Sequence, residues 1–326
     1  MIIDRRSFHG GIIAAALLAG VAQTTAQTAY PARPIHLIVG FAAGGPTDVL
    51  ARIIGGRMSE ILGQQVVVEN RTGASGNIAT QMVVRAPNDG YTILMGANSN
   101  VVNESLFKNL PFKFADDLIP VAPLAEAPTV LVVHPSLDVK SVQDLIALAR
   151  VKPGEIMYAT AGKGTTTHLA GELFGLMAGV KLTPVPYKGS GETTKDLLSG
   201  QIKVMFSPIP PVLSFIQDGQ LRGIASTGPR RASVAPGLPT VEEAGLSGFD
   251  MRMWFGLMAP LGTPDDIVDK LSQAAGEALR SDGVKAALAK QGYEPPPGTR
   301  QQFGAFIREE IDKWAKVVAT FGPIEQ

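Results

Sequence analysis

A glycine-containing loop between an apolar run and a helical pattern carries the clearest chemistry in the sequence. The apolar run Ile35–Val39 leads into Gly44 and Gly45, and a helical pattern begins near Thr47. Glycine has no side chain, so its backbone approaches a ligand closely, and the first N–H groups of a helix have no partner within the helix. Such N–H groups bind anions. The stretch 41–48 is therefore predicted to hold a carboxylate or a phosphate.

A second loop repeats this arrangement further along the chain. A strand-like run ends before Gly162–Gly164, and Thr165 is the expected N-cap of a helix with Thr166 and Thr167 in its first turn. The glycine pattern lacks the third glycine of a dinucleotide fingerprint, so it indicates a second anion-facing helix rather than a nucleotide site. For His168, contact with a ligand and a local hydrogen bond both stay open.

Several other polar residues follow strand-like runs. Asn98, Ser99 and Asn100 come in succession after one run, and Tyr187 and Lys188 form a turn after another. These side chains donate or accept hydrogen bonds, and Lys188 attracts anions. An ordinary exposed turn explains both groups equally well.

Residues for catalysis are not arranged in any familiar pattern. The chain contains no Gly-x-Ser-x-Gly elbow, no His-Glu-x-x-His helix and no Walker loop. Asp48 is expected to be a helix N-cap or a first-turn acid, and Arg52 to pair with a neighbour. The sequence thus favours binding without chemistry, cofactor or metal. The alternative is an exported hydrolase or isomerase that uses Asp48, His168 and Lys188 as acid–base groups.

Charge and cysteine content exclude several classes of partner. The chain has 29 basic and 29 acidic residues, no cysteine, and only 18% charged residues. Nucleic acid and anionic membrane surfaces are therefore poor candidate partners, and no disulfide stabilises the fold. We expect a monomer that binds a small molecule.

The first 26 residues have the features of an export signal. Arg5 and Arg6 precede the apolar run 12–21, and small residues up to Ala26 offer a cleavage site. The run is too short to span a membrane, which needs about 20 apolar residues. We expect cleavage near Ala26 and a periplasmic mature protein. A twin-arginine signal and an ordinary basic leader both remain open.

The rest of the chain alternates strand-like and helical patterns, which is typical of an α/β protein with mostly parallel sheet. We expect one lobe at residues 27–127 plus 251–326 and a second lobe at 128–250. The predicted anion loops follow strands, so they are expected along sheet edges and beside a cleft between the lobes.

Taken together, these motifs resemble the Bug-type periplasmic solute receptors of tripartite tricarboxylate transporters, and the resemblance covers essentially the whole mature chain. The matching stretches are Tyr30–Ile35, Phe41–Asp48, Val67–Arg71, Asp89–Thr92, Leu169–Phe174, Val185–Gly189, Pro239–Gly245 and Trp254–Leu257. The resemblance implies a two-lobed, periplasmic-binding-protein-like (Venus flytrap) fold whose cleft binds a di-, tri- or aromatic carboxylate for the membrane components of the transporter. Delivery to a membrane sensor instead stays open.

Carried over by motif, the implied ligand-binding residues come from both lobes. They are Phe41, Ala42, Gly44, Gly45, Thr47, Asn98, Ser99, Asn100, Ala161, Gly164, Thr165, Thr166, His168, Tyr187, Lys188 and Ser207. The chain departs from the family pattern at Ser207, where many relatives carry Asp, at Glu104, where Pro is common, and at Asn100, where His often occurs. A hydroxyl at Ser207 in place of a carboxylate favours a more acidic or bulkier ligand.

Overall fold

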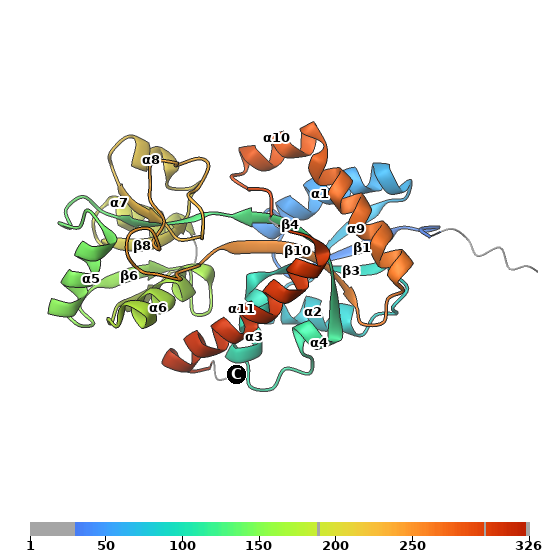
Figure 1. Ribbon diagram of the computed structural model, residues 1–326, viewed down its shortest axis with the longest axis horizontal. Helices are drawn as coiled ribbons and strands as arrows, with labels where there is room; N and C mark the ends of the chain where they lie inside the picture. The colour runs from blue at the N-terminus through green and yellow to red at the C-terminus, as the bar shows by residue number, and fades with distance from the viewer. Residues whose placement is uncertain (1–29, 188–189, 297, 324–326) are drawn as a thin grey trace, which may run out of the picture.

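Two five-stranded sheets, one in each of two lobes, organise the chain (Figure 1). The computed structural model describes residues 30–187, 190–296 and 298–323. The first sheet has the order β2-β1-β3-β10-β4 and consists of β1 (Ile35–Val39), β2 (Val66–Asn70), β3 (Thr92–Ala97), β4 (Leu118–Ala127) and β10 (Met253–Pro260). The second has the order β7-β6-β8-β5-β9 and consists of β5 (Thr129–Val133), β6 (Met157–Thr160), β7 (Thr183–Pro186), β8 (Val204–Pro208) and β9 (Arg222–Ser226).

The two sheets have equivalent topologies. Strands β2-β1-β3 are parallel in the first sheet, as are β7-β6-β8 in the second. Strand β10 pairs antiparallel with β3 and β4, and β5 pairs antiparallel with β8 and β9. The prediction of mostly parallel sheet is therefore wrong, because half of these pairings are antiparallel. The reason is that the chain enters the second lobe through β4 and returns through β10, so each sheet receives a strand running against its neighbours.

Eleven α-helices are found in the described residues, and most connect successive strands. They are α1 (Pro46–Leu62), α2 (Asn77–Val84), α3 (Asn98–Leu106), α4 (Phe114–Asp117), α5 (Val142–Val151), α6 (Thr166–Ala178), α7 (Ser190–Leu198), α8 (Leu213–Gln217), α9 (Asp265–Arg280), α10 (Asp282–Lys290) and α11 (Arg300–Phe321). A short 3-10 turn at Ala74–Gly76 precedes α2. None of these helices has the length and apolar character needed to cross a membrane.

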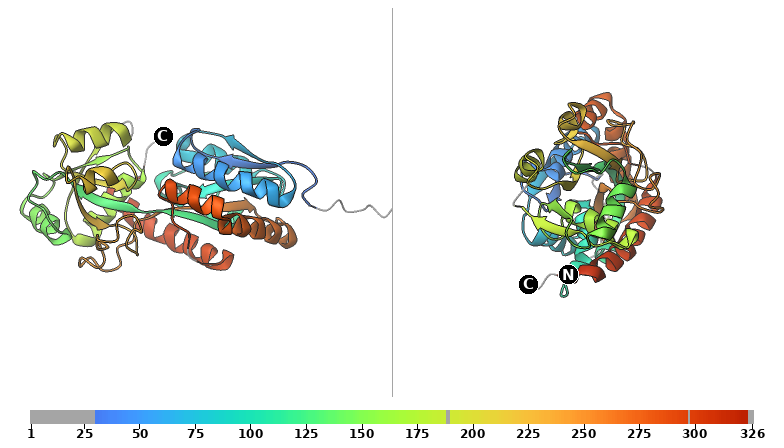
Figure 2. Two further views of the ribbon diagram at one scale, coloured as in Figure 1. Left: turned by 90° about the horizontal axis from the view of Figure 1, so that it is seen from above. Right: turned by 90° about the vertical axis from the view of Figure 1, so that its left-hand side faces the viewer.

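The long C-terminal helix α11 joins the two lobes. It packs against α3 and β4 of the first lobe and reaches α6 of the second. Figure 2, seen from above, shows the lobes end to end along the long axis with the green β4 segment and the red α11 running between them. Glu310 of α11 is buried and accepts hydrogen bonds from the indole N–H groups of Trp254 (3.2 Å) and Trp314 (2.9 Å). This helix therefore belongs to the core of the molecule.

An ion-pair cluster lies where the chain passes between the lobes. Glu126, near the end of β4, accepts hydrogen bonds from Arg230 Nη2 (2.9 Å) and Arg252 Nη1 (2.6 Å). Arg252 Nη2 also bonds Asp250 (2.7 Å), just before β10. Glu126 and Arg252 are largely buried, so removing one partner would leave an uncompensated buried charge and cost more than breaking an exposed pair. The sequence offered no pattern that points to it.

Candidate functional site

The loop after β1 presents the N-terminus of α1 at the edge of the first sheet. Gly45 is the N-cap in an extended conformation, and Gly44 has φ +79°, which favours glycine. Pro46 occupies the first helical position and has no N–H group. The amides of Thr47 and Asp48 are therefore the N–H groups of this helix end that stay available to an anion. We call residues 41–48 the first cradle.

Asp48 shapes this cradle from within the first turn. It is not the N-cap; its buried carboxylate accepts hydrogen bonds from the amide of Gly44 (2.8 Å) and from Asn70 Nδ2 (2.9 Å). Arg52 Nη2 pairs with the same group at 2.9 Å, as expected from the sequence. Burial raises the pKa of Asp48, but the hydrogen bonds from Arg52, Gly44 and Asn70 outweigh it and hold this pKa below its ordinary value. Asp48 is thus a charged structural group.

The loop after β6 has the same backbone form in the second lobe. Thr165 is the N-cap, with φ −74° and ψ 161°, close to the −74° and 167° of Gly45. Gly164 has φ +78°, and its amide donates to His168 Nδ1 at 3.3 Å. His168 therefore occupies the position that Asp48 has in the first lobe, four residues after the bonded glycine. We call residues 160–168 the second cradle.

Further hydrogen bonds hold the second cradle in shape. The amide of Ala161 donates to Thr167 Oγ1 (2.9 Å), and the hydroxyl of Thr165 donates to the carbonyl of Gly162 (2.7 Å). Thr165 is the N-cap residue by backbone position, as predicted, but its side chain makes no capping bond. The hydroxyl of Thr166 lies on the side that faces the first lobe.

A polar contact joins the first lobe to the second cradle. Asn98, at the start of α3, donates from Nδ2 to Thr166 Oγ1 over 3.4 Å. This contact joins the carboxyl end of β3 in the first lobe to the start of α6 in the second. The sequence predicts Asn98–Asn100 as a polar loop, whereas these residues form the first turn of α3, because Asn100 Oδ1 accepts the amide of Ala97 (2.8 Å).

Two of the predicted ligand-binding residues, Asn100 and Ser207, use their side-chain polar atoms in hydrogen bonds within the protein. Asn100 is buried and also donates from Nδ2 to Thr80 Oγ1 (3.0 Å). Ser207 is fully buried inside β8, and its hydroxyl donates to the carbonyl of Pro208 (2.8 Å). Ser99 differs, because its buried hydroxyl has no partner among the described residues. Ser99 is therefore the more available polar group of this set.

The other predicted ligand-binding residues differ in exposure and in their contacts. Phe41 is half-buried, and its ring lies against Gly76, where an added Cβ would stand 3.5 Å from it. Ala42 is exposed. The hydroxyl of Tyr187 donates to Asp196 Oδ2 (3.0 Å), which orients that ring. Lys188 lies outside the described residues.

A loop that the sequence motifs did not indicate lies beside Phe41. Residues 73–76 all have positive φ, and two of them, Ala74 (46°) and Ser75 (55°), are not glycine. Asn103 Nδ2 binds the carbonyl of Ser75 (3.0 Å) and holds this conformation. Strain of this kind concentrates at functional sites. The pair of glycines at 73 and 76 was the signal that could have indicated it.

Replacing Ser75 with Gly should raise the free energy of unfolding by about 0.5–1 kcal/mol, because glycine adopts the left-handed region without steric cost. The side chain of Ser75 is exposed, so little packing is lost. Chemical denaturation measures the change. Ser75→Ala is the matched control and should give no gain; equal stability of the Gly variant and the wild type would contradict the strain.

His168 should make the protein less stable in mild acid. Burial, followed by the charge of Lys163, lowers the pKa of His168 from 6.5 to about 4. The unfolded chain binds this proton more tightly than the folded chain does. His168 therefore does not lower the free energy of unfolding above about pH 6.5. As the pH drops from 6.5 toward 4, the free energy of unfolding falls by about 3 kcal/mol in total. In urea denaturation across this range, His168→Asn should show a shallower loss than wild type. Parallel pH profiles would contradict this assignment.

The acid–base groups of the enzyme alternative are engaged in structure. Asp48 and His168 each bond a loop glycine of their own lobe. Within the described part of the chain, no group of three His, Cys, Asp or Glu side chains is placed to hold a metal ion. The arrangement offers helix N-termini and hydroxyl groups from two lobes, which suits binding of an anion.

The chain is similar in sequence and in structure to known solute receptors. Residues 50–322 match the family model described as tripartite tricarboxylate transporter family receptor. The chain is 40% identical over 306 residues to Protein BugT of Bordetella pertussis, covering 93% of this chain and 94% of that protein. A solved structure described as R. palustris Rpa4515 with adipate is 39% identical with a TM-score of 0.74, covering 89% of this chain and 98% of the other. MatC of Rhodopseudomonas palustris with bound malate is 32% identical with a TM-score of 0.73, covering 89% and 100%.

Proposed function

Because the chain belongs to the tripartite tricarboxylate transporter receptor family, we propose that it binds a small dicarboxylate between its two lobes and presents it to membrane components of such a transporter. The family is one of solute receptors, so the alternative of an exported hydrolase or isomerase is set aside. Delivery to a membrane sensor remains a second route for the same ligand-bound form.

The observation that carries this proposal is the pair of equivalent cradles. Each lobe offers a helix N-terminus whose preceding glycine, Gly44 or Gly164, is bonded to the side chain four residues later. The helix dipole and the unpaired amides favour negative charge at the N-termini of both helices, α1 and α6. The Asn98–Thr166 contact brings the two lobes together beside them. A ligand with an anionic group therefore has recognition elements on both lobes.

The ligand class follows from the cradles and the relatives. Adipate and malate, named for two solved relatives, are both dicarboxylates. We propose a dicarboxylate from malate to adipate in length. The proposed contact residues are those carried over by motif except His168, which is bonded to Gly164 of its own loop, with the 73–76 loop added. Asn100 and Ser207 act through the backbone they hold, because their polar atoms are already bonded.

The cellular setting is proposed from the leader and the family together. Residues 1–26 are proposed to be removed near Ala26, and the mature protein to work in the periplasm as a monomer. The closing bodies are proposed as residues 27–127 plus 251–326 and residues 128–250. Closure around the ligand would create the surface that the transporter recognises.

Thermal shift across a panel of carboxylates tests the proposal. Malate, succinate, glutarate and adipate are compared with their monocarboxylate and diamine counterparts. A dicarboxylate at 100 times its Kd should stabilise the folded protein by about 2.7 kcal/mol. The diamines should have no effect. Absence of stabilisation by every anion would overturn the proposal.

A further inference from the structure

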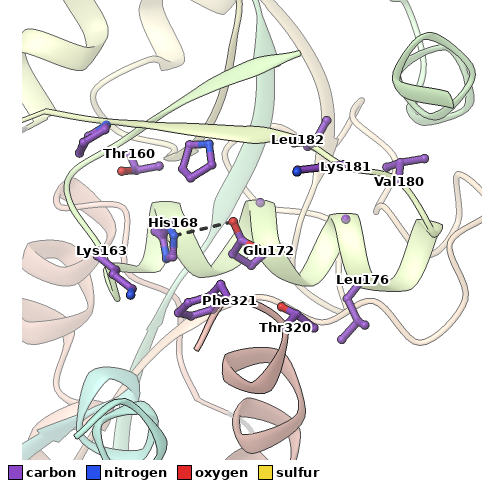
Figure 3. Close-up of a pocket in the computed structure, with 14 residues that line it drawn as sticks. Thr160, Lys163, His168, Glu172, Leu176, Val180, Lys181, Leu182, Thr320 and Phe321 are labelled. Carbon is purple, nitrogen blue, oxygen red and sulfur yellow. Dashed lines mark ion pairs between the residues drawn. The ribbon is translucent and has the colours of Figure 1, made fainter. Parts of the chain in front are cut away.

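A cavity of about 610 Å³ lies behind the second cradle, between α6, β7 and the end of α11 (Figure 3). Its volume is that of a site for a drug-sized molecule. Its walls are mostly apolar, and they are lined by Gly171, Gly175, Leu176, Val180, Leu182, Pro184, Pro186 and Phe321. Gly171 lets the ring of Tyr158 pack against α6, since an added Cβ would stand 2.3 Å from that ring. The polar contact between Asn98 and Thr166 is not part of this lining.

One end of the cavity carries a hydrogen-bond donor that has no hydrogen-bond partner among the residues the structure describes. Nδ1 of His168 accepts the amide of Gly164 (3.3 Å), so the neutral ring carries its proton on Nε2. The depressed pKa of His168, due to burial and then to Lys163, keeps the ring neutral near pH 7. The ring packs edge-to-face on Phe321 at 4.8 Å between centroids, which fixes its direction.

An acceptor stands beside this donor. Oε1 of Glu172 lies 3.7 Å from His168 Nε2, beyond hydrogen-bond distance. The hydroxyl of Tyr158 donates to the same oxygen (2.9 Å) and fixes the carboxylate. Figure 3 shows the two side chains next to one another on α6, above Phe321. A ligand hydroxyl placed about 2.8 Å from both groups would accept from His168 and donate to Glu172.

The charges around the cavity favour a molecule with an anionic group as well. Lys163 and Lys181 both line it, and neither has a carboxylate partner among the described residues. Lys163 Nζ donates to the carbonyl of Pro323 (3.4 Å) and lies 5.7 Å from the Phe321 ring centroid. An apolar ring between the hydroxyl and the anionic group would pack on the aliphatic wall formed by α6 and β7.

We propose that this cavity is a second binding site, distinct from the ligand site between the cradles, and that it takes a hydroxylated aromatic acid. The hydroxyl occupies the gap between His168 and Glu172, the ring packs on the apolar wall, and the carboxylate faces Lys181, because Lys163 lies at the His168 end of the cavity (Figure 3). Thr320 and Phe321 come from α11, so both lobes wall the site. Occupancy is thereby linked to the position of α11 and, through the other nitrogen of His168, to Gly164 of the second cradle. This proposal does not depend on the identity of the cleft ligand.

Titration calorimetry with 4-hydroxyphenylacetate and phenylacetate tests the site on the whole mature chain. The hydroxylated compound should bind about tenfold more tightly, since phenylacetate leaves the donor and acceptor unpaired. Leu176 is 45% exposed, so Leu176→Trp fills the cavity without cost to the core and should abolish this binding. Leu261→Trp, at a site 59% exposed on the other lobe, is the matched control and should bind as wild type.

A variant of the first cradle, Gly45→Leu, separates the two sites. It should keep its affinity for 4-hydroxyphenylacetate while losing affinity for dicarboxylates. Equal binding of the two aromatic acids, unchanged binding by Leu176→Trp, loss of binding in Gly45→Leu, or no binding at millimolar concentration would each overturn the second site. None of these results bears on dicarboxylate binding, which is measured separately.

Discussion

Asp48→Ala should lower the free energy of unfolding by about 1–2 kcal/mol and weaken dicarboxylate binding at least tenfold. The substitution leaves the amide of Gly44 without its side-chain acceptor at a partly buried site, whereas Asn70 Nδ2 keeps the carbonyl of Phe41 as a second acceptor. Each unpaired buried donor costs about 1–3 kcal/mol. Arg52 is half-exposed and regains water, so its contribution to the loss is small. Binding weakens because the cradle loses the bond that fixes Gly44.

The control for Asp48 is Asp48→Asn, which keeps one acceptor oxygen and removes the charge. We expect it to lose about half as much stability as the Ala variant. Urea denaturation and calorimetry on the same preparations report the two effects. An Ala variant as stable as the wild type would show that the carboxylate does not hold the loop, and retained affinity would show that ligand binding does not depend on Asp48.

Glu310→Ala should lower the free energy of unfolding by about 4 kcal/mol, a larger loss than that expected for Asp48→Ala. Trp254 and Trp314 are both essentially buried, and their indole N–H groups have Glu310 Oε2 as their acceptor. Removing it leaves two buried donors unpaired and a cavity between large rings. Lys313 pairs with Glu310 and donates to the carbonyl of Asp250 (3.0 Å), so the loss reaches the segment between the lobes.

Glu310→Gln separates the hydrogen bonds from the charge. Its amide oxygen accepts from an indole, so we expect a loss of about 1–2 kcal/mol. Chemical denaturation followed by tryptophan fluorescence reports both the stability and the surroundings of the two rings. If Glu310→Gln loses as much free energy of unfolding as Glu310→Ala, the loss comes from the ion pair with Lys313 and not from the hydrogen bonds of the indole groups.

Local sequence patterns predicted most of the helices that carry the cradles. A helical apolar pattern over 47–62 followed by Gly63 predicts a helix with a glycine C-cap, and α1 begins one residue earlier and has that C-cap. Ser141 ahead of a helical pattern that reaches Arg150 predicts an N-cap, and its side chain accepts the amide of Asp144 at the start of α5. The helical pattern over 300–321 predicts α11 with the bounds observed. These elements have short-range causes, a glycine or hydroxyl at a helix end and a helical apolar period, which a sequence displays directly.

Elements that depend on distant contacts were not predictable in this way. Strand β4 contains Pro120 and Pro123, which interrupt its apolar pattern, and only its pairing with β10 makes it a strand. The start of α3 at Asn98 depends on a side-chain bond that closes its first turn. The Glu126 cluster joins residues more than one hundred positions apart, and no local spacing encodes that.

The equivalence of the two cradles was only partly visible in the sequence. Both glycine loops were predicted, but Asp48 and His168 have different chemistry and gave no sign of a shared position. The backbone geometry reveals that role, because each accepts the amide of the glycine before the N-cap. A charged acceptor in one lobe and a neutral one in the other make the second cradle the less negative of the two, which favours an anionic ligand there.

Binding of one dicarboxylate by both cradles is tested most directly by calorimetry on one variant from each lobe. Gly45→Leu and Thr165→Leu change the two N-cap positions, both of which have φ −74°, a value that residues other than glycine adopt. A Cβ at position 45 would lie 3.2 Å from the carbonyl oxygen of Ala42, which a small shift of the loop relieves. With the dicarboxylate that gives the largest thermal shift, each variant should lose at least about 1.4 kcal/mol of binding free energy, a tenfold change in Kd, while circular dichroism stays unchanged. Wild-type affinity in either folded variant would contradict a ligand held by both lobes.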